Sequence, residues 1–213
     1  TRAPRPVGKV RSTAGVRLVT IAVLIPTIPE RANLLQRAVA SVTAQTLQPD
    51  EICIAVARPG EPAWSTRDRA LRMATAEWVA PLDDDDEFLP HHLEACARHA
   101  AATDADMVFP WFVTDHCSDP FPGEFGAPWD PDHPRQTTTV IFARRHAIND
   151  VGGYRFVDGD RHDDGGNRAG EDFDLVKRLN AGGHRIVHLP ERTWVWWHWA
   201  GNTSGLPERR RTP

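Results

Sequence analysis

The sequence predicts an α/β fold, with a mostly parallel central sheet flanked by helices in a single domain. Continuous aliphatic runs, typical of strands buried on both faces, alternate along the chain with segments whose apolar residues recur at helical spacing. Strands and helices that alternate in this way form a largely parallel sheet with helices on both faces. The length of 213 residues suffices for one substantial core.

The first half of the chain shows this alternation clearly. Residues 19–25 form a β-branched and aliphatic run that ends at Pro26, which predicts a buried strand. Pro29 then opens a segment with leucine, alanine and valine at helical spacing, which predicts a helix. Further on, we expect strands at 52–56, 77–82 and 107–113 and helices at 66–76 and 90–102.

The pattern loosens after residue 114. Residues 115–136 are rich in proline, glycine and aspartate, which indicates a loop. The polar, glycine-rich stretch 157–169 is long enough for a mobile lid or an acceptor-binding loop. The elements expected here are strands at 137–142, 184–188 and 193–197, a short helix at 144–150, and a helix from Gly170 to the Gly182-Gly183 pair.

Charge is balanced overall but uneven along the chain. The net charge of −4 gives no general affinity for polyanions. Basic residues mark an arm at 1–17 and a tail at 205–213, on either side of an expected catalytic domain at 18–204. Such ends could contact an acidic membrane surface, nucleic acid or a partner, although flexible, solubilising ends are the favoured interpretation.

The cysteines and the apolar runs indicate a soluble, cytoplasmic protein. Three cysteines without a Cys-x-x-Cys pair do not make a disulfide framework. The apolar run at 18–25 is too short to span a bilayer, and the N-terminus lacks the features of a signal peptide. We therefore expect no integral membrane segment, while the oligomeric state stays open.

Four consecutive aspartates at 83–86 directly follow the apolar run 78–82. Crowded like charges at the end of a buried strand repel one another, so an ordered fold would keep them if a cation neutralised them. Ligands of such sheets bind at the carboxyl ends of the strands, where this run lies. A metal-binding acidic turn is thus the first hypothesis, and a solvated acidic loop is the alternative.

The order of motifs along 19–204 resembles the family 2 glycosyltransferases, in particular short members from actinobacteria and their phages. The resemblance implies the GT-A fold, a Rossmann-like arrangement, in a bacterial or phage-infected bacterial cell. The motifs are Val23-Leu24-Ile25-Pro26-Thr27, Ala40-Ser41-Val42 with Gln45-Thr46, Leu82 and the four aspartates with Pro90, Val151-Gly152-Gly153-Tyr154, Gly170-Glu171-Asp172, and Asn202-Thr203-Ser204.

The resemblance implies a metal-dependent enzyme that moves a hexose from a nucleotide-diphosphate sugar to an acceptor hydroxyl. A divalent cation would absorb the negative charge that develops on the leaving diphosphate, and carboxylates suit Mn²⁺ or Mg²⁺. By position, Asp85 is the expected direct ligand, and Asp83 contacts the ribose or the metal through water. Asp84 and Asp86 are supporting candidates. His198 would face the diphosphate or metal, with an ordinary hydrogen-bonded histidine as the alternative.

The resemblance also implies a base for the acceptor hydroxyl. Asp172 takes this role and Glu171 positions the acceptor, which implies a one-step, inverting displacement. A helix N-terminus would favour the ionised carboxylate that a base needs at neutral pH. The alternative is that the two residues only cap a helix.

Other positions would contact the donor or the acceptor. Thr27 would lie beside the nucleotide base, and Arg67 and Asp68 lie where the family places an Arg-Asn pair near the nucleotide. A UDP-sugar is the commonest donor class, but residues 55–58 lack the aspartates that end this strand in the family. Trp111 and Trp197 could line the sugar or acceptor site, with core packing as the alternative.

The sequence is also compatible with other functions. One is a nucleotidyltransferase or another α/β enzyme that binds nucleotide and metal, although the segment 26–31 lacks a glycine-rich phosphate loop with a lysine. Another is a catalytically inactive sugar-binding module of the same fold. His92 and Cys96 have the spacing of half a zinc site, without a second half. The acceptor class is open among protein, glycan and modified DNA.

Overall fold

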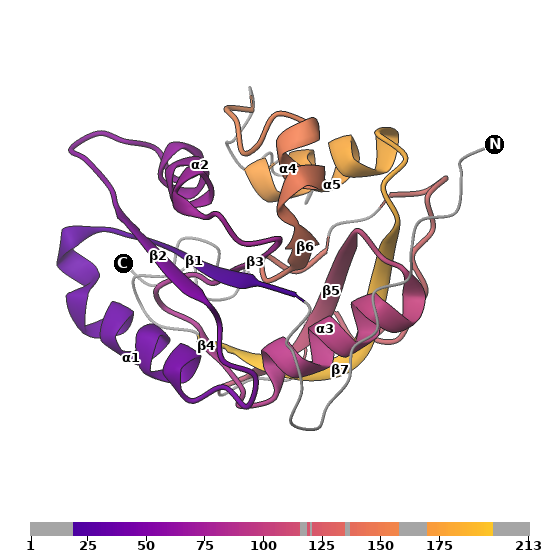
Figure 1. Cartoon of the computed structure of the whole chain (residues 1–213), viewed down its shortest axis with the longest axis horizontal. Helices are drawn as coiled ribbons and strands as arrows, with labels where there is room; N and C mark the ends of the chain where they lie inside the picture. Colours follow the sequence, from indigo (N-terminus) through magenta and orange to yellow (C-terminus); the bar gives the residue numbers. More distant parts are fainter. Residues whose placement is uncertain (1–18, 116–118, 120, 135–136, 158–169, 198–213) are drawn as a thin grey trace.

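The computed structural model describes residues 19–115, 119, 121–134, 137–157 and 170–197. In this part of the chain one seven-stranded sheet runs in the order β2-β1-β3-β6-β5-β7-β4 (Figure 1). The predicted basic arm and tail lie outside the described residues, so both stay predictions. The strands are β1 (Ile21–Thr27), β2 (Glu51–Val56), β3 (Trp78–Pro81), β4 (Glu87–Phe88), β5 (Met107–Thr114), β6 (Phe142–Arg144) and β7 (Ile186–Trp196).

The sheet is mixed, and most of its strands share one direction. β1 pairs in parallel with β2 and β3, and β5 pairs in parallel with β7. β6 is antiparallel to both β3 and β5, so those two strands run the same way, and β4 is antiparallel to β7. The predicted α/β fold with a mostly parallel sheet is confirmed.

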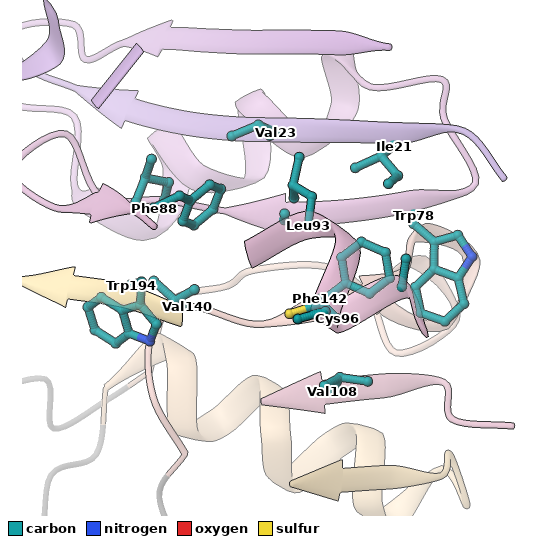
Figure 2. Close-up of a cluster of buried hydrophobic side chains, with 14 of the residues drawn as sticks. Ile21, Val23, Trp78, Phe88, Leu93, Cys96, Val108, Val140, Phe142 and Trp194 are labelled. Carbon is teal, nitrogen blue, oxygen red and sulfur yellow. The ribbon is translucent and has the colours of Figure 1, made fainter. Parts of the chain in front are cut away.

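Helices cover both faces of the sheet, and β1 shows why its run is continuously apolar. Ile21, Val23 and Ile25 pack in one buried cluster with residues of α1 and α3 (Figure 2). Ala22 and Leu24, which point the other way, pack with residues of α2, α4 and α5. The helices are α1 (Ala32–Thr43), preceded by the 3-10 turn η1 (Pro29–Arg31), α2 (Ala63–Met73), α3 (His92–Thr103), α4 (Arg145–Asp150) and α5 (Glu171–Ala181).

β1 continues past Pro26, where the sequence pattern predicted its end. The pairing of β1 with β3 stops at Leu24, while the pairing with β2 continues to Thr27. Leu24 accepts a hydrogen bond from Leu82 on the β3 side, and Pro26, two residues on, faces that same side. Pro26 has no N–H to donate, but β3 is no longer paired with β1 at this position. β1 therefore tolerates the proline.

Three other elements differ from expectation. The strand expected at 137–142 is shorter and later, at β6 (Phe142–Arg144). Just before it, the Thr138 hydroxyl donates to the carbonyl of Val140 at 2.7 Å and lies 3.1 Å from the carbonyl of Pro110. The two strands expected at 184–188 and 193–197 are one strand, β7, whose register with β5 shifts on either side of Trp111. This irregularity accommodates Pro190 within β7. β4, two residues long, was not predicted.

Within the described ranges, no helix combines the length and the apolar character that crossing a bilayer requires.

Candidate functional site

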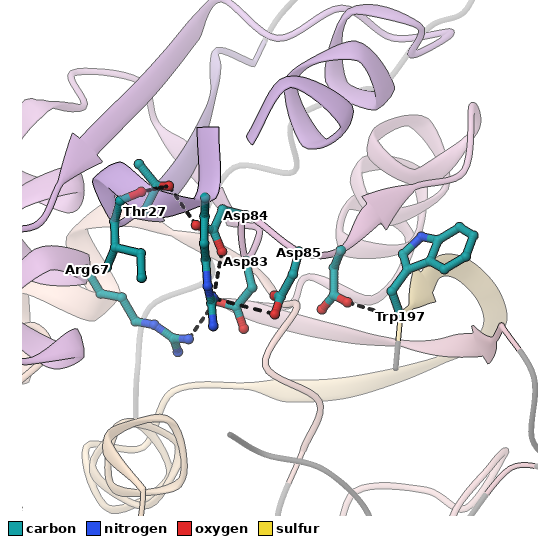
Figure 3. Close-up of polar contacts among 9 residues, drawn as sticks. Thr27, Arg67, Asp83, Asp84, Asp85 and Trp197 are labelled. Atoms are coloured by element: carbon teal, nitrogen blue, oxygen red, sulfur yellow. Dashed lines mark hydrogen bonds and ion pairs between the residues drawn. The ribbon is translucent and has the colours of Figure 1, made fainter. Parts of the chain in front are cut away.

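The four aspartates form a turn directly after β3, at the carboxyl end of the parallel strands. The backbone N–H of Asp86 donates to the carbonyl of Asp83 at 3.1 Å, which closes the turn. Carboxylate oxygens of Asp83, Asp85 and Asp86 all lie within 4.8 Å of one another (Figure 3). Asp85 and Asp86 are buried, so the alternative of a solvated acidic loop is wrong. We call Asp83, Asp85 and Asp86 the acidic trio.

Asp84 points away from the trio and fastens the turn to the end of β1. The Thr27 hydroxyl donates to Asp84 Oδ2 at 2.6 Å, and Arg31 Nη1 donates to Asp84 Oδ1 at 2.9 Å. Both carboxylate oxygens are thus bonded to the protein, and the Asp84 side chain is only 3% exposed. Arg31 also lies 3.5 Å from Asp85 Oδ2. The four identical residues therefore divide into one that anchors the turn and three that converge.

The acidic trio has the chemistry of a site for a hard divalent cation. Burial raises the pKa of Asp86 well above its ordinary value, and the neighbouring charges of Asp83 and Asp85 raise it further. The backbone N–H of Trp197 donates to Asp86 Oδ1 at 3.0 Å and opposes this shift. Crowded, buried carboxylates are destabilised as anions unless a positive charge lies among them. Three convergent carboxylate oxygens fit Mn²⁺ or Mg²⁺ better than a thiolate- or imidazole-binding metal.

Arg67 on α2 connects this trio to the residues expected to act as base. Its Nη2 donates to Asp83 Oδ1 at 2.5 Å. Its Nη1 donates to Asp172 Oδ1 and lies 3.5 Å from Glu171 Oε1. Burial opposes the charge of the guanidinium, but Asp172, Asp83 and Glu171 outweigh it and raise the pKa of Arg67. The structure thus brings together Asp83, Glu171 and Asp172, which are far apart in the sequence.

Glu171 and Asp172 begin α5, yet neither caps it. The N-cap residue is Gly170, and no side-chain hydrogen bond caps the helix, so the capping alternative lacks support. Burial raises the pKa of Asp172 to about 7; Arg67 opposes this, while Glu171 and Asp83 add to it. The raised pKa of Asp172 runs against the ionised form that a helix N-terminus favours, because burial disfavours the charged carboxylate.

Of the remaining predicted residues, Trp197 contacts the acidic trio only through its backbone, and the others lie apart from it or outside the described residues. The buried carboxylate of Asp68 pairs with Arg72 at 2.7 Å and lies against Gly153. Trp111 packs in the core, and its indole N–H donates to Asp119 Oδ2 at 2.6 Å. Trp197, directly after β7, lies under the guanidinium of Arg37 at 4.5 Å. His198, the motif at 202–204 and the stretch 158–169 lie outside the described residues.

Two further groups bear on the sequence predictions. Arg31 was not singled out, although a charged residue soon after the carboxyl end of the first strand is a signal that would have found it. His92 and Cys96 are both fully buried, and His92 Nδ1 lies 2.8 Å from the hydroxyl of Thr193. His92 also stacks on Phe88, and burial lowers its pKa to about 3. This pair packs in the core, as an ordinary structural histidine and thiol do.

Comparisons with known proteins agree with this architecture. Residues 65–157 match the model of glycosyl transferase family 2, a range that contains the acidic turn and the Gly152-Gly153 pair. S. aureus TarS superposes with a TM-score of 0.66 at 14% identity, over 84% of this chain and 37% of the TarS chain. TarS 1–349 in complex with UDP-GlcNAc superposes with a TM-score of 0.66 at 14% identity, over 88% of this chain and 61% of that fragment.

The fragment of TarS bound to UDP gives a TM-score of 0.61 at 14% identity, over 84% of this chain and 60% of that fragment. This chain therefore spans less than two thirds of each of these structures. The likeness confirms the predicted GT-A fold. No curated protein matches this chain.

Proposed function

We propose that this chain is a family 2 glycosyltransferase that transfers a sugar from a nucleotide-diphosphate donor to an acceptor hydroxyl. The match of residues 65–157 to the family model and the fold support this proposal. One observation carries the proposal: Arg67 bonds both Asp83 of an acidic trio suited to a divalent cation and Asp172 at the start of α5, beside Glu171. Glycosyl transfer needs both features, one for the leaving group and one for the incoming hydroxyl.

The donor side is formed by the acidic turn. Asp83, Asp85 and Asp86 would hold Mn²⁺ or Mg²⁺, with Asp85 as direct ligand and Asp83 near the ribose or the metal. The cation, when bound, supplies positive charge for the departing diphosphate. A UDP-sugar is the donor we propose, since TarS 1–349 has been crystallised with UDP and with UDP-GlcNAc. Thr27 would contribute through Asp84, whose position it fixes.

The acceptor side is formed by the start of α5. Asp172 would accept the proton of the acceptor hydroxyl as that oxygen attacks the anomeric carbon, in one displacement with inversion. A base must lose its proton near the working pH, and burial brings the pKa of Asp172 to about 7, which suits that task. Glu171, which shares the Arg67 contact, would orient the acceptor.

The test is a donor panel followed by one substitution. The chain is incubated with Mn²⁺ and a set of nucleotide sugars, and nucleotide release is followed by mass spectrometry. We expect slow donor hydrolysis with at least one donor, and transfer once an acceptor hydroxyl is supplied.

Asp172→Asn keeps the shape of the side chain but removes the base, so it should bind donor and fail to transfer. Asp150→Asn, an exposed carboxylate at the end of α4, is the matched control and should behave as wild type. If no donor is hydrolysed and Asp172→Asn changes nothing, the chain is a sugar-binding module without catalysis.

A further inference from the structure

Arg67 lies between the acidic trio and the start of α5. Its side chain is 14% exposed and reaches from α2 toward the acidic turn (Figure 3). One terminal nitrogen contacts the turn through Asp83, and the other contacts α5 through Asp172 and Glu171. A single side chain thus touches both the cation side and the base side of the site.

The geometry of a guanidinium makes this contact specific. Its terminal nitrogens are held in a rigid plane, so groups bonded to them are held at a fixed separation and orientation. A lysine ammonium has one nitrogen on a flexible stem and does not impose that separation. Arg67 also keeps its charge at every working pH, because three carboxylates raise its pKa above an already high ordinary value.

The groups that face Asp172 come from three directions besides Arg67. Glu171 precedes it on the same helix, and Asp83 approaches from the acidic turn. Tyr154 lies beside it from the turn after α4, and burial raises the pKa of this phenol, so it carries no charge at neutral pH. Of these groups, Arg67 is the one that stabilises the ionised form of Asp172 by its charge.

We propose that Arg67 is a positioning residue that couples the cation site to the base, by holding Asp83 with one nitrogen and Asp172 with the other. Asp83 is shared between Arg67 and the acidic trio, so a cation bound at the trio changes what Arg67 holds. The coupling rests on the proposed function for the role of Asp172 as base, while the contact itself does not. Such a coupling is reciprocal: a cation at the trio changes the proton affinity of Asp172, and protonation of Asp172 changes the affinity for the cation by the same factor.

The first experiment needs no substrate. The carboxyl carbons of the chain are titrated by NMR in wild type, Arg67→Gln and Arg67→Lys, and the resonance that disappears in Asp172→Asn is assigned to Asp172. Removing a positively charged side chain that contacts a carboxyl group raises the pKa of that group by about one to three pH units. We expect the pKa of Asp172 to rise by this amount in Arg67→Gln. Arg67→Lys keeps the positive charge but lacks the two fixed terminal nitrogens. The pKa of Asp172 in this variant should therefore lie between those in wild type and in Arg67→Gln.

Arg69→Gln is the matched control, because it removes one positive charge from the same helix, and Arg69 pairs with Glu61 at 2.8 Å. It should leave the titration of Asp172 at the wild-type position. An Asp172 titration that is the same in Arg67→Gln and Arg69→Gln would overturn the proposal. If Arg67→Gln fails to fold, the comparison of Arg67→Lys with Arg69→Gln decides in the same way.

The second experiment measures transfer across pH. If the pKa of Asp172 rises from about 7 by one to three pH units, the ionised fraction at pH 7 falls about 5-fold to 500-fold. The turnover number of Arg67→Gln should fall by that factor, its acid limb should move to higher pH, and the KM for the donor should change less. A shifted titration without transfer in any variant would sink the proposed function and leave the coupling standing.

Discussion

Replacing Gly153 by alanine tests how closely α2 must approach the turn after α4. Gly153 has a φ of +69°, which disfavours any residue with a Cβ. A Cβ built there would lie 2.3 Å from Oδ1 of Asp68, far inside contact distance. The neighbouring Gly152 has a φ of +88°, but a Cβ there would have no atom within 4 Å. The two glycines therefore separate backbone strain from a steric clash.

The expected costs differ by the clash alone. The left-handed conformation costs a non-glycine residue about 1–2 kcal/mol, and both substitutions incur this. Gly153→Ala must in addition displace the Asp68 side chain, which is 11% exposed, and such overpacking of a core costs about 1–3 kcal/mol. We expect a loss of about 1–2 kcal/mol for Gly152→Ala and about 2–5 kcal/mol for Gly153→Ala in the free energy of unfolding.

Urea unfolding of five chains measures this difference: wild type, Gly152→Ala, Gly153→Ala, Asp68→Ala and the double variant Asp68→Ala with Gly153→Ala. Without the Asp68 carboxylate, the nearest remaining atom to the new Cβ is Leu71 Cδ2 at 3.7 Å, an ordinary contact. Gly153→Ala should then cost no more than Gly152→Ala does, which gives a coupling of about 1–3 kcal/mol between the two sites. Equal costs in the presence and absence of Asp68 would refute the close approach.

Three further predictions concern the site and the core. Asp85→Ala should abolish Mn²⁺-dependent donor binding in calorimetry, whereas Asp150→Ala should bind as wild type; retained Mn²⁺ dependence in Asp85→Ala would exclude Asp85 as ligand. Transfer should fall as the pH drops through about 7, because Asp172 takes up a proton and ceases to be a base; a flat rate from pH 8 to about 5.5 would contradict this. Leu93→Ala should lower the free energy of unfolding by about 2–5 kcal/mol in urea, because Leu93 is fully buried, and a loss below about 1 kcal/mol would argue against its place in the core.

The fold was predictable where one stretch of sequence decides the outcome. β1, β2 and β5 are runs of mostly apolar residues, and such runs carry their own signal. β1 and β5 are buried along most of their length, whereas β2, at the edge of the sheet, buries only Cys53 and Ala55. β4 has two residues and owes its conformation to pairing with β7, which no local pattern records. β7 crosses Pro190, a local signal for a break that the long pairing with β5 overrides.

The sequence indicated where the candidate site lies, but not which of the four aspartates takes which role. An acidic run after a buried strand pointed to the turn, and the family resemblance pointed to Glu171 and Asp172, the two carboxylates that Arg67 joins to it. Which of the four aspartates points away from the other three depends on Thr27 and Arg31, which lie 57 and 53 residues from Asp84 in the sequence. The protonation of Asp172 likewise depends on burial and on contacts made only in the folded chain. Four identical residues in a row thus acquire different roles only through the contacts that each makes in the folded chain.

Those partners come from separate parts of the fold, and this arrangement prepares the turn for its task. Arg67 of α2 holds Asp83, Thr27 at the end of β1 holds Asp84, and the backbone after β7 holds Asp86. A ligand that binds a turn already held on several sides need not order it, so little binding free energy is lost to conformational entropy. The repulsion among the carboxylates is therefore maintained by the surrounding fold, and a cation that enters the trio relieves it.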